Sequence, residues 1–275
     1  MEKYGTLYLC PTPIGNLEDI TLRALRVLNE VDLIAAEDTR QTLKLLNHYE
    51  IKKPLVSYHE HNKAAMGPKL IEKLKNGKSI ALVSDAGTPS ISDPGEELVS
   101  LSIKEGIRVV PLPGPTAAIT ALIASGLDTS SFVFEGFLPK KKKERKKQLE
   151  KISKEERTTI IYESPHRLKE TLEELTHYIG NRRVVVAREL TKIHEEFIRG
   201  TAQEILEKIG DEVKGEIVIV IEGAKTEFLK EDPKELLHEY LRLGMDKREA
   251  VKKVARELGI PKREIYKIAL DENDN

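Results

Sequence analysis

The chain is poor in the residues that several classes of protein depend on. Its 275 residues include a single cysteine, Cys10, and no tryptophan. One cysteine cannot form an internal disulfide, and such sparing use is typical of the reducing cytosol. No apolar run approaches the roughly 20 residues of a membrane-spanning helix, and no signal peptide is visible. We therefore expect a cytoplasmic protein without membrane segments.

Several motifs of nucleotide and metal sites are also missing. No Gly-x-Gly-x-x-Gly follows an expected strand, so a Rossmann dinucleotide site or the common methyltransferase site has no support. The P-loop motif is absent as well. His59 and His61 are the nearest pair among scattered histidines, and together with one cysteine they lack the spacing of a zinc site. We expect no metal centre.

Charge is balanced over the whole chain but uneven along it. The 45 basic and 46 acidic residues leave a net charge of -1, so any nucleic-acid surface must be local. Seven of the eight residues 140–147 are basic, which predicts either a solvated helix start or an arm that follows RNA phosphates. Residues 246–270 hold eight basic and four acidic residues. The candidate RNA contacts are Lys141, Lys142, Arg145, Arg167, Arg188, Lys262 and Arg263.

Apolar periodicity predicts an α/β chain in three parts. In residues 1–126, strands expected at 6–10, 31–36, 55–58, 79–83 and 107–110 alternate with helices, which predicts a parallel sheet with helices on its faces. The rhythm breaks near residues 126–131. A second α/β domain, 127–224, has strands expected at 132–137, 158–162, 183–187 and 216–221 and an extended segment at 195–200. Residues 225–275 read as three short helices with a glycine turn, a helix-turn-helix-like extension.

Loops rich in glycine and proline follow several of these strands. The longest, residues 84–95, contains Gly87, Pro89, Pro94 and Gly95. Glycine and proline release or restrict the backbone at defined points, so the loop has a defined shape. Open α/β sheets bind ligands at the carboxyl ends of their strands. The alternative is an ordinary strand-to-helix connection, although this one is long for that purpose.

Seven separate loops, in order, resemble one subfamily of the tetrapyrrole-methylase-like enzymes. That subfamily is the bacterial small-subunit ribosomal RNA 2′-O-methyltransferase I. The residues that carry the resemblance are 11–21, 36–40, 84–95, 113–118, 135–139, 162–167 and 187–190. The match runs from about residue 5 to 223 and again through the C-terminal helices.

The resemblance implies two α/β domains of the tetrapyrrole methylase type, with S-adenosylmethionine held in the cleft between them, and a homodimer. It also implies methyl transfer to the ribose 2′-hydroxyl of a decoding-centre cytidine in 16S ribosomal RNA. The implied cofactor contacts are Pro13, Ile14, Asp85, Gly87, Thr88, Pro89, Ile91, Thr116, Ala117, Tyr162 and Leu190. The tetrapyrrole enzymes have Gly-Asp-Pro or a Gly-rich version where this chain has Gly87-Thr88-Pro89, a departure that argues against a macrocyclic substrate.

The residues leave the catalytic base and two other functions open. A ribose hydroxyl is a poor nucleophile, so a base or a polarising cation would help. The catalytic candidates are Asp38, Arg40, His166 and Glu189; Glu163 is a further possible base, and each could equally be a loop-capping ion pair. A small-molecule methylase acting on a tetrapyrrole precursor and a non-catalytic RNA- or ribosome-binding module are the alternatives. The C-terminal helices could contact RNA, dock a protein or cap the dimer.

Overall fold

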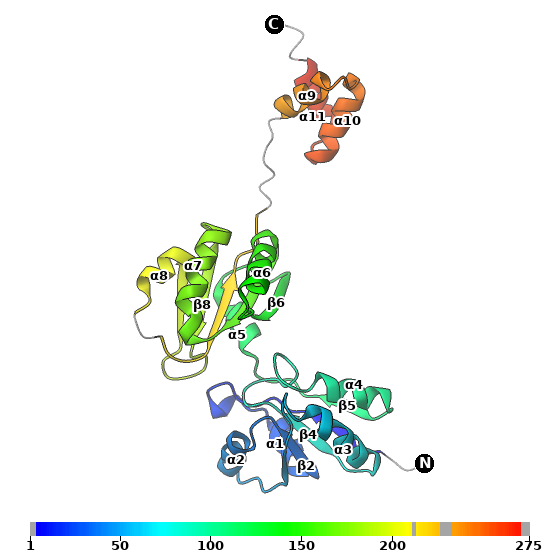
Figure 1. Cartoon of the computed structure of the whole chain (residues 1–275), viewed down its shortest axis with the longest axis vertical. Coiled ribbons are helices and arrows are strands. Elements are labelled where there is room, and N and C mark those ends of the chain that lie inside the picture. The colour runs from blue at the N-terminus through cyan, green and yellow to red at the C-terminus, as the bar shows by residue number, and fades with distance from the viewer. Residues whose placement is uncertain (1–3, 211–212, 226–232, 271–275) are drawn as a thin grey trace. The chain divides into compact units, whose positions relative to one another are not determined.

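The chain forms two compact units, residues 1–224 and 225–275. The structure is a computed structural model, which describes residues 4–210, 213–225 and 233–270 (Figure 1). In the described part of the chain, no helix is both long and apolar enough to cross a membrane. The first unit contains two five-stranded sheets, and the second contains three helices.

The first sheet is parallel throughout, as the strand–helix alternation predicts. Its strand order is β3-β2-β4-β1-β5, and each neighbouring pair is parallel. The strands are β1 (Thr6–Leu9), β2 (Leu33–Ala36), β3 (Leu55–Ser57), β4 (Ile80–Val83) and β5 (Arg108–Pro111). All five carboxyl ends therefore meet at one edge of the sheet, where the connecting loops gather.

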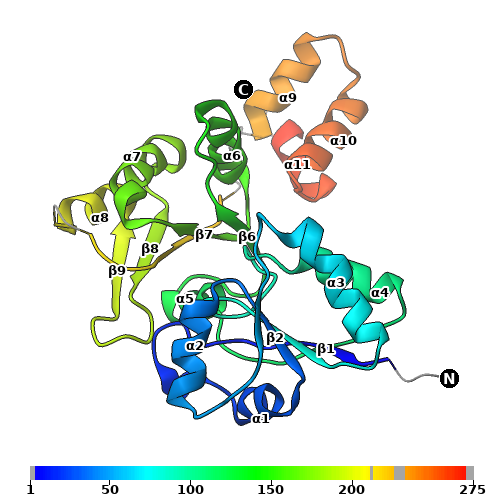
Figure 2. The same ribbon diagram turned by 60° about the horizontal axis from the view of Figure 1, so that its bottom comes forward.

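Helices cover both faces of this sheet. Figure 2 shows α1 (Leu22–Glu30) and α2 (Thr39–His48) on one side, and α3 (Lys63–Lys75) and α4 (Glu96–Lys104) on the other. Successive residues of a strand point to opposite faces. On β4, Ala81 and Val83 pack with α1 and α2, whereas Ile80 and Leu82 pack with α3 and α4. The continuous apolar run of β4 thus reflects burial on both faces.

Side-chain caps fix where the first helices begin. The Thr21 hydroxyl accepts a hydrogen bond from the Ala24 amide at 3.0 Å and starts α1. The Asp38 carboxylate accepts one from the Arg40 amide at 2.8 Å and starts α2. Residues 37–40 were expected to form a loop closing the second strand. Instead α2 begins at Thr39, because Asp38 satisfies a free amide of its first turn.

The second sheet is mixed, with order β6-β7-β10-β8-β9. Its strands are β6 (Phe132–Phe137), β7 (Thr158–Glu163), β8 (Arg183–Arg188), β9 (Glu196–Thr201) and β10 (Ile217–Ile221). Only the β6–β7 pair is parallel. Strand β10 comes last along the chain but lies between β7 and β8, and all five of its residues are buried.

Both faces of the second sheet are covered, one of them by the helix that leaves the first sheet. Helices α6 (Lys142–Lys154), α7 (Leu168–Ile179) and α8 (Ala202–Lys208) pack against Ile217, Ile219 and Ile221 of β10. Helix α5 (Ala117–Ser125) packs against Val218 and Val220 on the opposite face. Because α5 follows directly from β5, its first turn lies where the loops of both sheets meet.

The second unit is a small three-helix cluster. Its helices are α9 (Pro233–Arg242), α10 (Lys247–Glu257) and α11 (Lys262–Leu270). They pack around a buried apolar core that includes Leu237, Val251 and Ile265. Gly259, with φ of +62°, forms the turn between α10 and α11, a left-handed conformation that favours glycine. This arrangement agrees with the expected helix-turn-helix-like extension.

Candidate active site

The first unit holds a cavity of about 420 Å³, lined by loops from both sheets. The first sheet contributes the loops after β1, β2, β4 and β5; the second contributes the end of β6, the loop after β7 and the start of β10. The lining residues are Ile14, Glu37, Asp85, Ala86, Gly87, Thr88, Ile91, Ser92, Asp93, Thr116, Ala117, Phe137, Tyr162, Glu163, Ser164, Pro165, Gly215, Glu216, Ile217 and Val218. Drug-sized ligands occupy pockets of this size.

Three loops are joined by hydrogen bonds at one wall of the cavity. Thr12 and Gly87 exchange backbone hydrogen bonds of 2.9 and 3.0 Å. The Thr88 hydroxyl donates to the Pro115 carbonyl at 2.9 Å. The loops after β1, β4 and β5 therefore support one another and hold a preformed surface.

The loop after β4 contains unusual backbone conformations. Gly87 has φ of +85°, and the non-glycine residues Ser90 and Ser92 have φ of +70° and +62°. A Cβ atom at Gly87 would lie 3.2 Å from Ile14 Cγ2. Left-handed non-glycine residues are strained and persist only where the surroundings fix them, which is common at ligand sites. Gly87 lets the backbone face the cavity without a side chain in the way.

The amino end of α5 and an aromatic group form a second wall. Tyr162 hydrogen-bonds the backbone of Ala118 and the side chain of Thr116, and burial raises the pKa of its hydroxyl. The ring centroids of Phe134 and Phe137 lie 4.9 and 5.5 Å from the ring centroid of Tyr162, in edge-to-face geometry. The first amides of a helix attract anions. This wall could hold a carboxylate beside a flat apolar group.

Five carboxylates line the same cavity: Glu37, Asp85, Asp93, Glu163 and Glu216. Burial, then the nearby charges of Glu37 and Asp85, raise the pKa of Asp93 to about 7. The pKa of Glu37 is also raised, first by burial and then by Asp85. The Asp85 carboxylate accepts a hydrogen bond from the Asp38 amide at 2.9 Å. The cavity can thus hold both a cationic group and a carboxyl that gains a proton near neutral pH.

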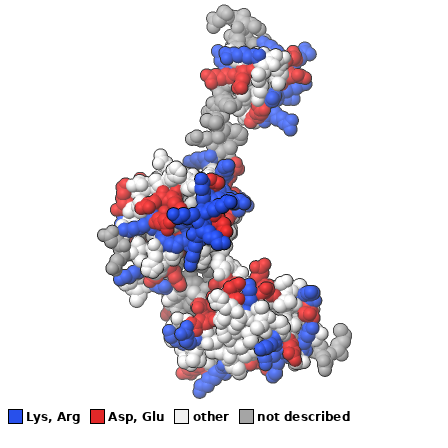
Figure 3. Space-filling view, in the orientation of Figure 1, with Lys and Arg blue, Asp and Glu red and all other residues white. Residues whose placement is uncertain are grey.

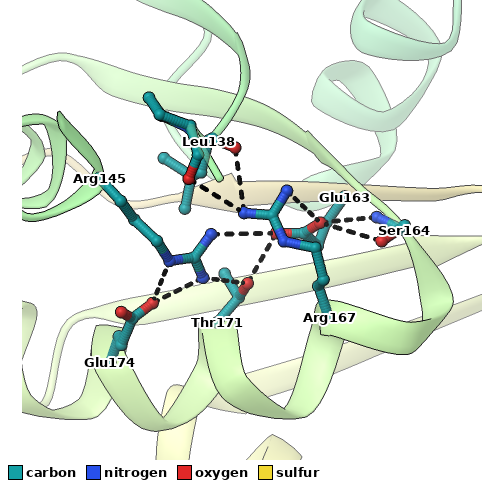
Figure 4. A network of polar contacts seen from close by, with 8 residues as sticks. Leu138, Arg145, Glu163, Ser164, Arg167, Thr171 and Glu174 are labelled. Carbon is teal, nitrogen blue, oxygen red and sulfur yellow. Dashed lines mark hydrogen bonds and ion pairs between the residues drawn. The ribbon is translucent and has the colours of Figure 1, made fainter. Parts of the chain in front are cut away.

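A buried polar network supports the wall formed by the end of β7 (Figure 4). The Glu163 carboxylate accepts hydrogen bonds from the Ser164 amide at 2.7 Å and the Thr171 hydroxyl at 2.6 Å. Arg145 donates to Thr171 at 2.8 Å and to Glu174 at 2.6 Å. Arg167 donates to the Leu138 carbonyl at 3.0 Å. The network fixes the loop of Ser164 and Pro165 against α6 and α7.

Most of the expected cofactor contacts come together in this cavity. Pro13, Pro89 and Leu190 lie outside the lining, and Leu190 is buried in the core between α5 and the second sheet. The expected contacts that line the cavity are Ile14, Asp85, Gly87, Thr88, Ile91, Thr116, Ala117 and Tyr162.

The four catalytic candidates lie outside the lining. Asp38 and Arg40 form an ion pair of 2.7 Å, and the hydrogen bonds from Arg40 lower the pKa of Asp38 to about 2. Glu189 accepts a hydrogen bond from Lys192 at 2.8 Å, which lowers its pKa. His166 is exposed, next to the cavity residue Pro165 in the short 3-10 helix η2 (Pro165–Arg167).

The candidate RNA contacts fall into exposed and buried groups. Figure 3 shows basic side chains gathered over the α6 region. Lys141 and Lys142, at the start of α6, are exposed. Lys262 and Arg263, at the start of α11, are exposed as well. The structure corrects the position expected for Arg145, which is 4% exposed because it faces the core beside Leu149 and Ile152. Arg167 and Arg188 are partly buried and paired with Glu163 and Glu196.

Several lining residues were not singled out from the sequence. Among them are Glu37, Asp93, Phe137 and Val218. A signal existed for Asp93, which belongs to the long loop after β4 that we expected to bind a ligand. None existed for Val218, because its place depends on β10 lying centrally in the second sheet.

Comparison with known proteins relates this geometry to a family. Residues 6–206 match the tetrapyrrole (corrin/porphyrin) methylases. The chain is 55% identical to ribosomal RNA small subunit methyltransferase I of Halalkalibacterium halodurans, over 96% of this chain and 94% of that one. It is 54% identical to the Bacillus subtilis protein of the same name, over 95% and 93%.

A solved structure shares the fold at low sequence identity. Uroporphyrin-III C-methyltransferase of Thermus thermophilus, complexed with S-adenosylhomocysteine, superposes with a TM-score of 0.56 at 18% identity, covering 78% of this chain and 97% of that one. The near full-length identity to two bacterial relatives is the more specific finding. The chain therefore belongs to the ribosomal RNA small subunit methyltransferase I family, within the tetrapyrrole methylases.

Proposed function

We propose that the protein transfers a methyl group from S-adenosylmethionine to the ribose 2′-hydroxyl of a decoding-centre cytidine in 16S ribosomal RNA. The observation that carries this proposal is the 55% identity, over 96% of the chain, to a relative named for ribosomal RNA methylation. The fold alone would not carry it, since one fold hosts several substrates. The 2′-hydroxyl and the cytidine come from the resemblance of the seven loops.

The cavity fits the cofactor in size and in the chemistry of its walls. Its volume of about 420 Å³ suits a nucleoside-sized ligand. When bound, S-adenosylmethionine supplies a methyl group already activated on a sulfonium. The first turn of α5 at Thr116 and Ala117 would hold the carboxylate, Asp85 would face the ammonium group, and the backbone at Gly87 would lie against the ligand.

The RNA would approach over the start of α6. Phe137 lines the cavity and Lys141 follows four residues later, so the chain between them spans at most about 14 Å. The Lys141 side chain is 82% exposed, and that of Arg40 is 87% exposed. We propose Lys141, Lys142, Arg40 and His166 as RNA contacts here, and Lys262 and Arg263 on the second unit. Phosphate contacts of this kind position the RNA without reading its sequence.

Two further features belong to the proposal. Ile119 and Ile123 on α5 are 39% and 72% exposed, which supports a homodimer that covers this face. Sedimentation equilibrium of the chain and of an Ile123→Glu variant would test that state. The buried single cysteine supports a cytoplasmic location.

Transfer of labelled methyl groups tests the proposal against its alternative. The protein is incubated with methyl-tritiated S-adenosylmethionine and, separately, small ribosomal subunits, naked 16S RNA or a tetrapyrrole precursor. Label in either RNA fraction supports the proposal. Label confined to the tetrapyrrole would instead assign a small-molecule methylase.

A further inference from the structure

Asp93 lies where two cavities meet. It lines the main cavity and also an adjoining one of about 380 Å³, whose other residues include Glu60, Lys63, Glu96 and Glu97. The left-handed backbone at Ser90 and Ser92 and the fixed φ of Pro94 define the path of the chain around it. The carboxyl is therefore held at the edge of the main cavity rather than free on the surface.

The other four carboxylates of the cavity already have partners. Glu163 accepts hydrogen bonds from the Ser164 amide and the Thr171 hydroxyl, and Glu216 pairs with Lys192 at 3.5 Å. Asp85 accepts a hydrogen bond from the Asp38 amide, and Glu37 accepts one from the Asp85 amide. Within the described part of the chain, Asp93 has a hydrogen bond only from the Ser84 hydroxyl, which is also within reach of the Gly87 carbonyl at 3.1 Å. Asp93 thus keeps acceptor capacity for a hydroxyl that enters the cavity.

We infer that Asp93 is the general base of the proposed reaction, the group that accepts the proton of the attacking ribose hydroxyl. This inference rests on the proposed function. The ribose oxygen forms its bond to the methyl carbon as the methyl–sulfur bond breaks, and the bonding pair returns to sulfur. The hydroxyl proton passes to the Asp93 carboxylate and then to water, so charge and atoms balance.

The surroundings adjust Asp93 to this task. The other titratable groups of the main cavity are Glu37, Asp85, Tyr162, Glu163 and Glu216, and those of the adjoining one are Glu60, Lys63, Glu96 and Glu97. Lys63 is engaged by Glu60 at 2.8 Å and does little to offset the acidic groups. Burial and the two neighbouring carboxylates bring the pKa of Asp93 to about 7. A base whose pKa lies near the working pH is the most effective one.

The test combines three variants with three measurements on the full chain. Asp93→Asn removes the base with little change of shape, Glu37→Gln removes a neighbouring negative charge, and Asp19→Asn is a control at an exposed residue of η1 (Leu17–Asp19). The measurements are the affinity for S-adenosylhomocysteine by calorimetry, the single-turnover methylation rate from pH 5 to 9, and a 13C-carboxyl NMR titration of aspartate-labelled protein.

Asp93→Asn should lower the single-turnover rate by about 100-fold or more, while the affinity for S-adenosylhomocysteine stays within about threefold. The titration near pH 7 should vanish from its NMR spectrum. In Glu37→Gln, both the NMR titration and the rising limb of the rate should move to lower pH, because a like charge has been removed. Asp19→Asn should match the unmodified chain.

Other outcomes overturn the inference without touching the proposed function. A rate within fivefold of the unmodified chain in Asp93→Asn would show that another group accepts the proton. A large loss of S-adenosylhomocysteine affinity in that variant would make Asp93 a cofactor ligand instead. Failure of the proposed function is a separate result, since the unmodified chain itself would then label no RNA.

Discussion

The Arg145 guanidinium lies 3.8 Å from the Glu163 carboxylate, and both side chains are almost wholly buried. Arg145 comes from a helix that begins with a run of lysines, and Glu163 from a strand end that lines the cavity. Thr171 bridges them by accepting from Arg145 and donating to Glu163. This pair joins the basic helix α6 to the wall of the cavity.

Removing Arg145 should destabilise the first unit. Arg145→Met keeps the apolar stem but removes one of the two guanidinium groups beside the buried Glu163, the other being that of Arg167 at 3.7 Å. Loss of a buried partner costs up to about 3–5 kcal/mol. Lys146→Met is the matched control, since its side chain is 68% exposed on the same helix. Chemical unfolding measures both. Equal free energies of unfolding for the two variants would contradict the role given to the network.

The sequence predicted the elements better than their arrangement. The strand expected over 132–137 matches the structure in both bounds, because apolar spacing and flanking turns are local signals. The central place of β10 is a long-range property that no local signal contains. Arg145 was counted with the surface charges, although it shares a helix face with Leu149 and Ile152, four and seven residues on.

Gly87→Val should abolish binding of S-adenosylhomocysteine. The branched side chain would enter the cavity beside Ile14 and would also strain a backbone with φ of +85°. Gly106→Val is the control, because Gly106 has φ of +70° but nothing within 4 Å of its added Cβ. Strain of about 1–3 kcal/mol should lower the melting temperature of both variants.

Calorimetry separates that strain from loss of the site. Gly106→Val should bind S-adenosylhomocysteine as the unmodified chain does, and Gly87→Val should give no heat. Normal binding by Gly87→Val would show that Gly87 is only a turn residue.

Neutralising the start of α6 should weaken RNA binding and leave cofactor binding intact. Lys141→Ala with Lys142→Ala removes two exposed charges. The matched control, Lys73→Ala with Lys104→Ala, removes two exposed charges from α3 and α4. In filter binding at several salt concentrations, only the first pair should lower the salt slope, by about 1–2.

The same measurement tests the C-terminal unit. Lys262→Ala with Arg263→Ala should reduce RNA affinity and the salt slope, because α11 presents both residues at its exposed start. Affinity and slope equal to those of the α3–α4 control would leave the three helices with a structural role. Binding of S-adenosylhomocysteine should be unchanged in both variants.

The raised pKa of Asp93 should also appear in the stability of the protein. In the unfolded chain Asp93 ionises near its ordinary pKa of 3.8, whereas in the folded chain it does so near 7. Between these pH values the folded state therefore binds one proton more than the unfolded state. The protonated Asp93 carboxyl stabilises the folded state fully below pH 3.8, and this stabilisation is lost as pH rises through 7.

Asp93→Asn cannot titrate, so its stability does not fall with pH as that of the unmodified chain does. The free energy of unfolding of the variant minus that of the unmodified chain should therefore rise between pH 4 and 7, by about 1–3 kcal/mol after allowance for solvent screening. Above pH 7 the difference should stay constant. A difference that does not change with pH would contradict the raised pKa.

Mapping the transferred methyl group tests the proposed reaction most directly. Small subunits or naked 16S RNA are methylated with labelled S-adenosylmethionine, and the labelled nucleotide is then located by alkaline hydrolysis and sequencing. We predict one labelled cytidine in the decoding centre whose 3′ phosphodiester bond resists alkali, because its 2′-oxygen is methylated. Label on a base, or spread over many nucleotides, would contradict the proposed function.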